Sequence, residues 1–259
     1  MTARNRIKAV LTLAAVAMLG LGTSANAEVI TVDGYDHWQS TTSTITGTFD
    51  ASGSDKLVVI VTGEHGFNND QGACTAVTYD GVALTEVINR DAQVATTDTI
   101  YNDMWILDSP ATSTGEIIAS VVNRGNVTVF ALSGTEDGVG ATAISLVNTR
   151  SVDLTTTADD SLVIASFGMG GAGNTANVTS VDPDAPLFET SAQENGNNWD
   201  GHVTAYVQVP TAGAGTYSFT GGNVSGAHVI AAEFLAIPEP ATMGLLALGG
   251  LVLLRRRRA

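Results

Sequence analysis

The chain has 259 residues, of which 44% are hydrophobic and 14% are charged, and its formal net charge is −15. The hydrophobic fraction excludes a disordered chain, and the length allows one large domain or two small ones. Between Glu28 and Ala236 the sequence holds 25 acidic and four basic residues, and this charge of −21 excludes nucleic-acid binding. The sole cysteine, Cys74, rules out a disulfide framework and a multi-cysteine metal site.

Residues 1–27 have the three parts of a secretory signal peptide. A basic segment precedes an apolar run, Ala9–Leu21, which is long enough for a signal peptide and short for a membrane span. The run leads to a cleavage site with small residues at Ala25 and Ala27, which signal peptidase accepts. We therefore expect export and a mature chain that begins at Glu28. The alternative is a buried N-terminal helix of the fold.

The body of the chain, residues 28–236, has no convincing helical period. Short runs rich in β-branched and aromatic residues recur there, bounded by Gly, Asn, Asp and Pro, and Asp80-Gly81 predicts a two-residue hairpin. This pattern indicates an all-β fold, and we expect a single two-sheet antiparallel β-sandwich, jelly-roll-like in its connections. The predicted strands are 43–49, 57–62, 75–79, 82–88, 100–107, 116–123, 127–133, 144–148, 162–167, 177–181, 202–209, 216–220 and 227–235.

The body also contains a faint internal repeat. Two tandem sandwich domains would explain it, and so would two halves of one sandwich. No linker rich in proline or serine separates the halves, so we favour one domain. The matching segments are Trp105–Pro110 with Ala205–Pro210 and Val127–Val129 with Ala227–Val229, both at an offset of 100, and Leu57–Val59 with Leu162–Ile164 at 105.

A segment centred on Trp199 is the strongest candidate for a ligand site. An aromatic ring stacks on the apolar face of a sugar, while Asn197, Asn198 and Asp200 supply hydrogen-bond donors and acceptors for its hydroxyls. The sequence therefore predicts weak binding of extracellular polysaccharide here, assisted by Phe67–Asp70.

Two further patterns in the sequence each allow two interpretations. Trp38 is a second candidate for sugar stacking, or it covers the rim of the core. Acidic residues in predicted loops offer oxygen ligands for weak calcium binding, or they keep an exported protein soluble. The four histidines are scattered, so no metal site and no cofactor are expected. The acidic positions are Asp33, Asp36, Asp70, Asp182, Asp184 and Asp200.

No catalytic motif in the sequence has the structural context that its chemistry needs. Gly168–Gly173 satisfies G-x-G-x-x-G, but the next residues predict loop and strand where a dinucleotide site needs a helix. The sequence has no nucleophile elbow and no H-E-x-x-H zinc helix. We expect a protein without enzymatic activity. The alternative is a secreted polysaccharide-active enzyme, of the glycoside hydrolase or lyase type, on a sandwich fold.

Residues 237–259 form a three-part tail with Pro238-Glu239-Pro240, the apolar run Ala241–Leu254 and four arginines. The run spans about 21 Å as a helix, short of a hydrocarbon core of roughly 30 Å, and clustered arginines stay on the cytoplasmic side. The tail resembles the PEP-CTERM sorting signal of Gram-negative bacteria.

That resemblance implies that the protein is a substrate of an exosortase, a membrane protease that cuts near Pro238, Glu239 and Pro240. It also implies transient anchoring in the inner membrane, followed by location at the cell surface or in the extracellular matrix. Signal peptidase and the exosortase are then the expected processing partners. An ordinary short C-terminal anchor is the alternative.

Overall fold

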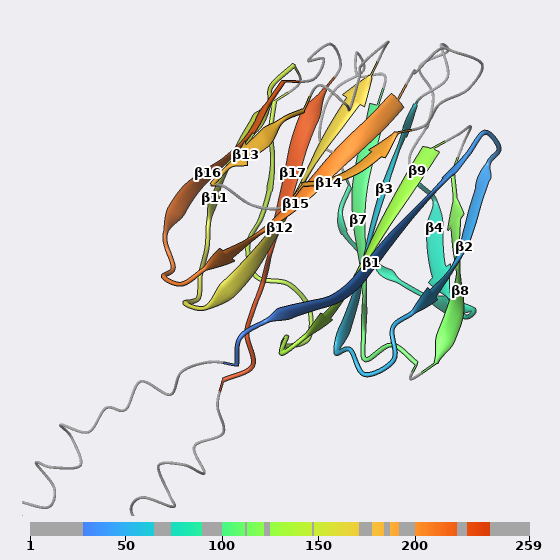
Figure 1. The fold of residues 1–259 in the computed structure, drawn as a ribbon, viewed down its shortest axis with the longest axis horizontal. Coiled ribbons are helices and arrows are strands. Elements are labelled where there is room, and N and C mark those ends of the chain that lie inside the picture. Colours follow the sequence, from blue (N-terminus) through green and yellow to red (C-terminus); the bar gives the residue numbers. More distant parts are fainter. Residues whose placement is uncertain are drawn as a thin grey trace, which may run out of the picture. The chain divides into compact units, whose positions relative to one another are not determined.

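The computed structural model describes residues 28–64, 74–89, 100–111, 113–121, 125–146, 148–170, 178–183, 187–191, 200–221 and 227–238. All regular elements in these ranges are β-strands, paired antiparallel (Figure 1). Residues 28–237 form one compact unit. Within the described ranges, no helix has the length and hydropathy of a membrane span. The predicted signal peptide and the tail from Glu239 onward lie outside them.

The strands fall into two sets in chain order. The first set is β1 (Thr31–Ser40), β2 (Thr44–Asp50), β3 (Lys56–Glu64), β4 (Ala76–Tyr79), β5 (Val82–Ala83), β6 (Thr85–Ile88), β7 (Ile100–Asp108), β8 (Thr114–Ser120) and β9 (Gly125–Ser133). The second set is β10 (Thr142–Ile144), β11 (Ser151–Thr155), β12 (Ser161–Gly170), β13 (Ser180–Asp182), β14 (Leu187–Ser191), β15 (Asp200–Val209), β16 (Ala214–Thr220) and β17 (His228–Phe234).

Each set makes its own two sheets, so the described residues form four sheets where two were expected. The first set gives the orders β1-β9-β3-β7-β6 and β2-β8-β4-β5, and the second gives β10-β17-β12-β15-β14 and β11-β16-β13. Apart from β5, every strand of the first half has a counterpart at the same place in the second. The internal repeat in the sequence therefore reflects two halves with the same strand order.

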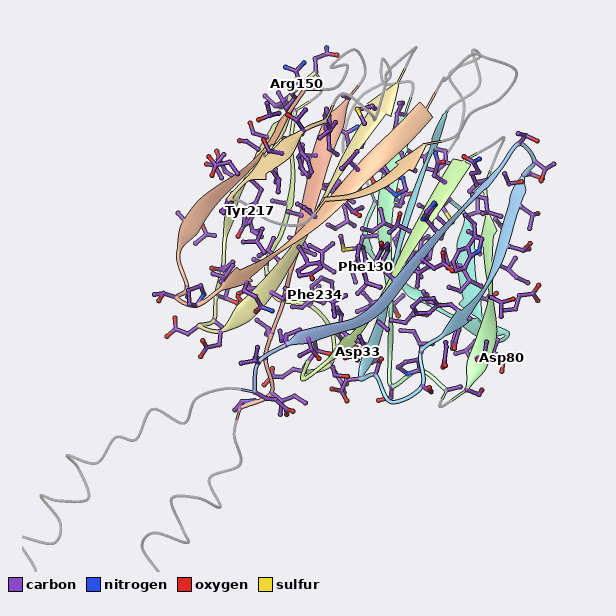
Figure 2. The ribbon with its side chains drawn as sticks, in the orientation of Figure 1. Asp33, Asp80, Phe130, Arg150, Tyr217 and Phe234 are labelled. Carbon is purple, nitrogen blue, oxygen red and sulfur yellow. The ribbon has the colours of Figure 1, made fainter. Side chains whose placement is uncertain are left out.

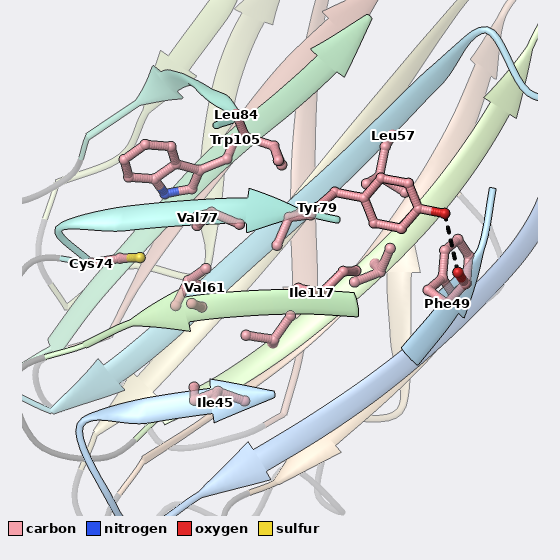
Figure 3. Close-up of a cluster of buried hydrophobic side chains, with 14 of the residues drawn as sticks. Ile45, Phe49, Leu57, Val61, Cys74, Val77, Tyr79, Leu84, Trp105 and Ile117 are labelled. Atoms are coloured by element: carbon pink, nitrogen blue, oxygen red, sulfur yellow. Dashed lines mark hydrogen bonds between the residues drawn. The ribbon is translucent and has the colours of Figure 1, made fainter. Parts of the chain in front are cut away.

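The first half has its own hydrophobic core between its two sheets (Figure 3). Alternate residues of β3 (Leu57, Val59 and Val61) face residues of β2, β4 and β8 in this cluster. Tyr79 is fully buried, and its hydroxyl lies 2.7 Å from the carbonyl oxygen of Ser113, which satisfies the one polar atom of the ring.

The second half repeats this arrangement. Alternate residues of β12, including Val163, Ala165 and Phe167, share a cluster with residues of β11, β13 and β16. Phe167 stacks on Phe219 of β16, with ring centroids 5.5 Å apart. Val163 occupies the place that Leu57 holds in the first half. Strands β3 and β12 therefore correspond at an offset of 106 residues, an even number that keeps the same face of each strand on its cluster.

The remaining faces of the two five-stranded sheets cover each other, since β3 and β7 contact β12, β15 and β17. The layer between them is apolar toward the end where β9 and β17 finish. Phe130 and Phe234 are fully buried in the interior of the body there, as Figure 2 shows. Ile106, Leu162 and Ile164 are buried in the same layer. Residues 28–237 thus hold together through a third buried layer.

The same layer is polar toward the end where β7 and β15 begin. Asn102 accepts hydrogen bonds from the hydroxyls of Thr62 (2.9 Å) and Ser166 (3.2 Å), and its Nδ2 donates to the Ser166 carbonyl. Thr128 Oγ1 lies 2.6 Å from His202 Nε2. Burial lowers the pKa of His202 to about 3, and the nearby charge of His37 adds to this effect. His202 is therefore a neutral bridging group between the halves.

A buried carboxylate ties the loops of the second half to β17. Glu233 is fully buried and accepts hydrogen bonds from the backbone N–H groups of Ala141, Thr157 and Ala158 and from the Thr157 hydroxyl. Burial acts to raise the pKa of Glu233, but these four donors outweigh burial and lower it. The folded state therefore stabilises the ionised form of Glu233.

The buried layer between the halves predicts one cooperative unfolding transition for the whole protein, because neither half can separate without exposing that layer. Hydrogen–deuterium exchange during a denaturant titration checks this. Strands β3 and β12 should lose protection at the same midpoint. Loss of protection in one half at a clearly lower midpoint would contradict the prediction.

Glu233→Gln should lower the free energy of unfolding at pH 7 by about 1.5–3 kcal/mol, since it replaces charge-assisted hydrogen bonds with weaker ones. A carboxylate whose pKa is lowered in the folded state stabilises above its unfolded pKa of about 4.5 and loses this contribution as pH falls through the folded value. The wild type should therefore lose more stability than the variant below pH 4.5. Denaturant titrations at pH 7 and pH 3 measure this, with exposed Glu116→Gln as the control.

Candidate functional site

The point where the body meets its tail is built from backbone hydrogen bonds. We define the C-terminal strap as residues 236–238 and the N-terminal strap as residues 28–30. Ala236 bridges to Thr135, and the N–H of Ile237 donates to the Gly134 carbonyl at 3.0 Å. The Ile237 carbonyl accepts from the N–H of Glu28 at 3.1 Å. The two straps therefore lie side by side, and exposed Pro238 follows directly.

The N-terminal strap is itself fixed to both halves. The Ile30 side chain is buried, and its carbonyl accepts a 2.7 Å hydrogen bond from Gln208 Nε2 of β15. Gly134 has a φ of +79°, a conformation that only glycine adopts without cost. A Cβ there would lie 3.1 Å from the Val29 carbonyl oxygen. These contacts hold the two ends of the body together at one place, the junction end.

The opposite end of the body is where β3 and β12 finish and β7, β9, β15 and β17 begin. The registers of both five-stranded sheets and the Asn102–Ser166 hydrogen bonds bring these six strand ends together. We call this the far end. Strand β12 has ten residues and a length of about 33 Å, so the far end is separated from the junction end by the length of the strands.

The structure places two of the predicted site residues and leaves the others outside its described ranges. Pro238 is exposed at the junction end. Asp200 is the first residue of β15, at the far end. Outside the described residues lie Ala25, Ala27, Asn197, Asn198, Trp199, Glu239 and Pro240, and also the assisting segment Phe67–Asp70.

Trp38 proves to be a core lid, which was the alternative to a sugar platform. Its ring packs edge-on against Phe49, with centroids 6.5 Å apart, and joins the first hydrophobic cluster. Gly47 makes room for it, since a Cβ at that position would lie 2.1 Å from the indole ring.

Two of the acidic residues that were candidates for calcium have structural partners. Asp33 accepts hydrogen bonds from the hydroxyls of Thr31, Ser54 and Ser133, which join β1 to the turn before β3 and to the end of β9. Asp36 accepts a hydrogen bond from the backbone N–H of His37. In the described part of the chain no group of three or more His, Cys, Asp or Glu residues could hold a metal ion. Burial, followed by the charge of Asp103, raises the pKa of the Cys74 thiol to about 12.

Sequence reasoning missed the two straps. Glu28 to Ile30 precede the first strand, and Gly134 is one of 28 glycines, so neither carries a recognisable signal. The tail was recognisable because its three parts are adjacent in sequence. The contacts of Ile237 join residues about 100 and 200 positions apart, which no local pattern reveals.

Comparison with known proteins supports this junction as the functional one. Residues 236–258 match the family model of the PEP-CTERM protein-sorting motif. Searches of curated proteins and of solved structures find no significant match to the chain. The matched segment begins at Ala236, which is still part of the folded body. The chain therefore ends in a PEP-CTERM protein-sorting motif, the signal of an exported protein that an exosortase processes.

Proposed function

We propose that the protein is a non-enzymatic component of the cell surface or extracellular matrix, trimmed at both ends during export. The sorting motif, joined without a linker to the all-β body, is the observation that carries this proposal. Before processing, the tail anchors the chain transiently at the inner membrane by its junction end.

We further propose that each half of the body is a jelly-roll-like sandwich, two in one compact unit in place of the single one expected. Strand order supports this, because the chain alternates between β1-β9-β3-β7 and β2-β8-β4-β5 as a jelly roll does. The hydrophobic cluster of each half supports the pairing of its sheets. The third layer supports cooperative behaviour of the two sandwiches.

The proposed ligand is extracellular polysaccharide, bound weakly through residues 194–200 around Trp199. Residue 200 begins β15 and residue 64 ends β3, so segments 194–200 and 67–70 both join strands at the far end. Single sites of this kind have affinities near millimolar, and retention then depends on many copies bound to one polymer.

Intact mass of the protein recovered from its native host tests the export and sorting proposal. We expect a mature chain that begins at Glu28 and lacks the four C-terminal arginines, found in the surface or matrix fraction. A matrix-associated product that retains those arginines would contradict sorting. Hydrolysis of the host's own exopolysaccharide by the purified protein would contradict the non-enzymatic role in favour of a secreted polysaccharide-active enzyme.

Trp199→Ala tests the binding residue. It should lower retention on the native matrix about five-fold per site, since stacking contributes on the order of 1 kcal/mol, while the melting midpoint moves by less than about 2 °C. Trp199→Phe keeps an aromatic face and is the matched control, with retention near that of the wild type. If Trp199→Ala instead unfolds the protein while the remaining folded fraction is fully retained, Trp199 is a core residue. A chelator should leave retention unchanged unless calcium bridges acidic loops to the polymer.

A further inference from the structure

The backbone of Ile237 has no free hydrogen-bonding group. Its N–H donates to the Gly134 carbonyl and its carbonyl accepts from the Glu28 N–H. Ala236, one residue earlier, is in the bridge with Thr135 and is buried. The last two residues of the body are therefore engaged through their backbone, and only Pro238 of the C-terminal strap is exposed.

A protease has to bind its substrate in an extended form, by pairing with backbone groups that are not already paired. Pro238 has no N–H and favours an extended conformation for the residue before it. In the sequence, the first residue after Ile237 that carries a backbone N–H is Glu239. Among the described residues, the backbone hydrogen bonds of the body thus end at Ile237, directly before the Pro-Glu-Pro motif.

The N-terminal strap keeps this arrangement in place. It is held by the buried Ile30 side chain and by the hydrogen bond from Gln208 to the Ile30 carbonyl. Gly134 supplies the carbonyl that binds Ile237, and only its missing side chain lets the backbone of Val29 approach so closely. Gly134 and the N-terminal strap, about 100 and 200 positions from the motif in sequence, therefore determine where the hydrogen-bonded part of the chain ends.

We propose that the folded body sets the upstream limit of exosortase processing, with Gly134 and the N-terminal strap as positioning elements for the cut. The straps withhold the chain up to Ile237, so the protease engages only Pro238 and the residues after it. This inference rests on the proposed function, since it requires that an exosortase processes the exported chain. The mature protein then keeps both straps, with its two ends tied to each other.

Gly134→Ala in the full chain, expressed in cells that carry an exosortase, is the direct test. Its Cβ forces the Val29 backbone away and strains a φ of +79°, so the C-terminal strap loosens. The precursor should be processed about five-fold faster, the factor that the loss of one hydrogen bond gives. Some mature chains should also end before Pro238. Gly81→Ala is the matched control, with the same φ of +79° in a hairpin and nothing within 4 Å.

Gln208→Glu is a second variant that leaves the backbone unstrained. It removes the donor to the Ile30 carbonyl and places a carboxylate against it, which should loosen the N-terminal strap and again speed processing. Gln39→Glu, at an exposed position of β1, makes the same chemical change away from the straps. Melting midpoints of each variant and its control should agree within about 2 °C, so a difference in processing reports access to the junction.

Pulse–chase rates and intact masses separate the outcomes. Wild-type chains that end at or after Pro238, together with faster processing of both strap variants, support the inference. Equal rates for the strap variants and their controls overturn it, as do wild-type mature chains that end before Ile237. After either of these results, export of the chain and removal of its four arginines would still support the sorting function. A precursor that stays uncut beside an active exosortase overturns the sorting function itself.

Discussion

The constraint on which the structure depends is that each five-stranded sheet is covered on both faces. One face packs on the smaller sheet of its own half and the other on the large sheet of the second half. A strand in this position must be apolar on both sides, and Leu57–Val61 and Leu162–Ala165 are continuous runs of buried apolar residues. Strands with only one covered face alternate between buried and more exposed residues, as β8 and β16 do. The sequence pattern thus follows the number of covered faces.

This constraint explains which parts of the fold could be predicted from the sequence. The Asp80-Gly81 hairpin is confirmed, and both its residues have positive φ. Each predicted strand overlaps an observed one, although 144–148 meets β10 only at Ile144 and 82–88 is divided between β5 and β6. Strands β1 and β14 were missed, and β11 was not among the predicted strands. All three are edge strands, and β1 carries mostly polar, solvent-facing residues. The match of Leu57 with Leu162 is wrong by one position. Period-2 geometry turns such a slip into a change of face, so Leu57 lies in the first cluster while Val163 takes its place in the second.

Local sequence carried the sorting signal, whereas the geometry around that signal depends on distant residues. A sorting motif works as a continuous stretch, so its parts are adjacent and recognisable. Its attachment depends on Gly134 and Glu28, which contribute backbone groups and no distinctive side chain. The polar layer between the halves was missed for a similar reason. Asn102, Ser166 and His202 come from three strands, and only the packing of two sheets brings them together.

The two ends of the body have different physical requirements, and the fold separates them. The proposed processing makes two proteolytic cuts close to the junction end, and paired straps with a buried Ile30 would keep the ends of the body attached there. The far end gathers the ends of six strands from both large sheets. A buried polar network underneath holds those strand ends in register across the two halves. Neutral groups are suited to this network, since burial lowers the pKa of His202 to about 3 and leaves its imidazole uncharged at neutral pH. The layer between the halves therefore runs from apolar packing near the junction end to a polar network near the far end.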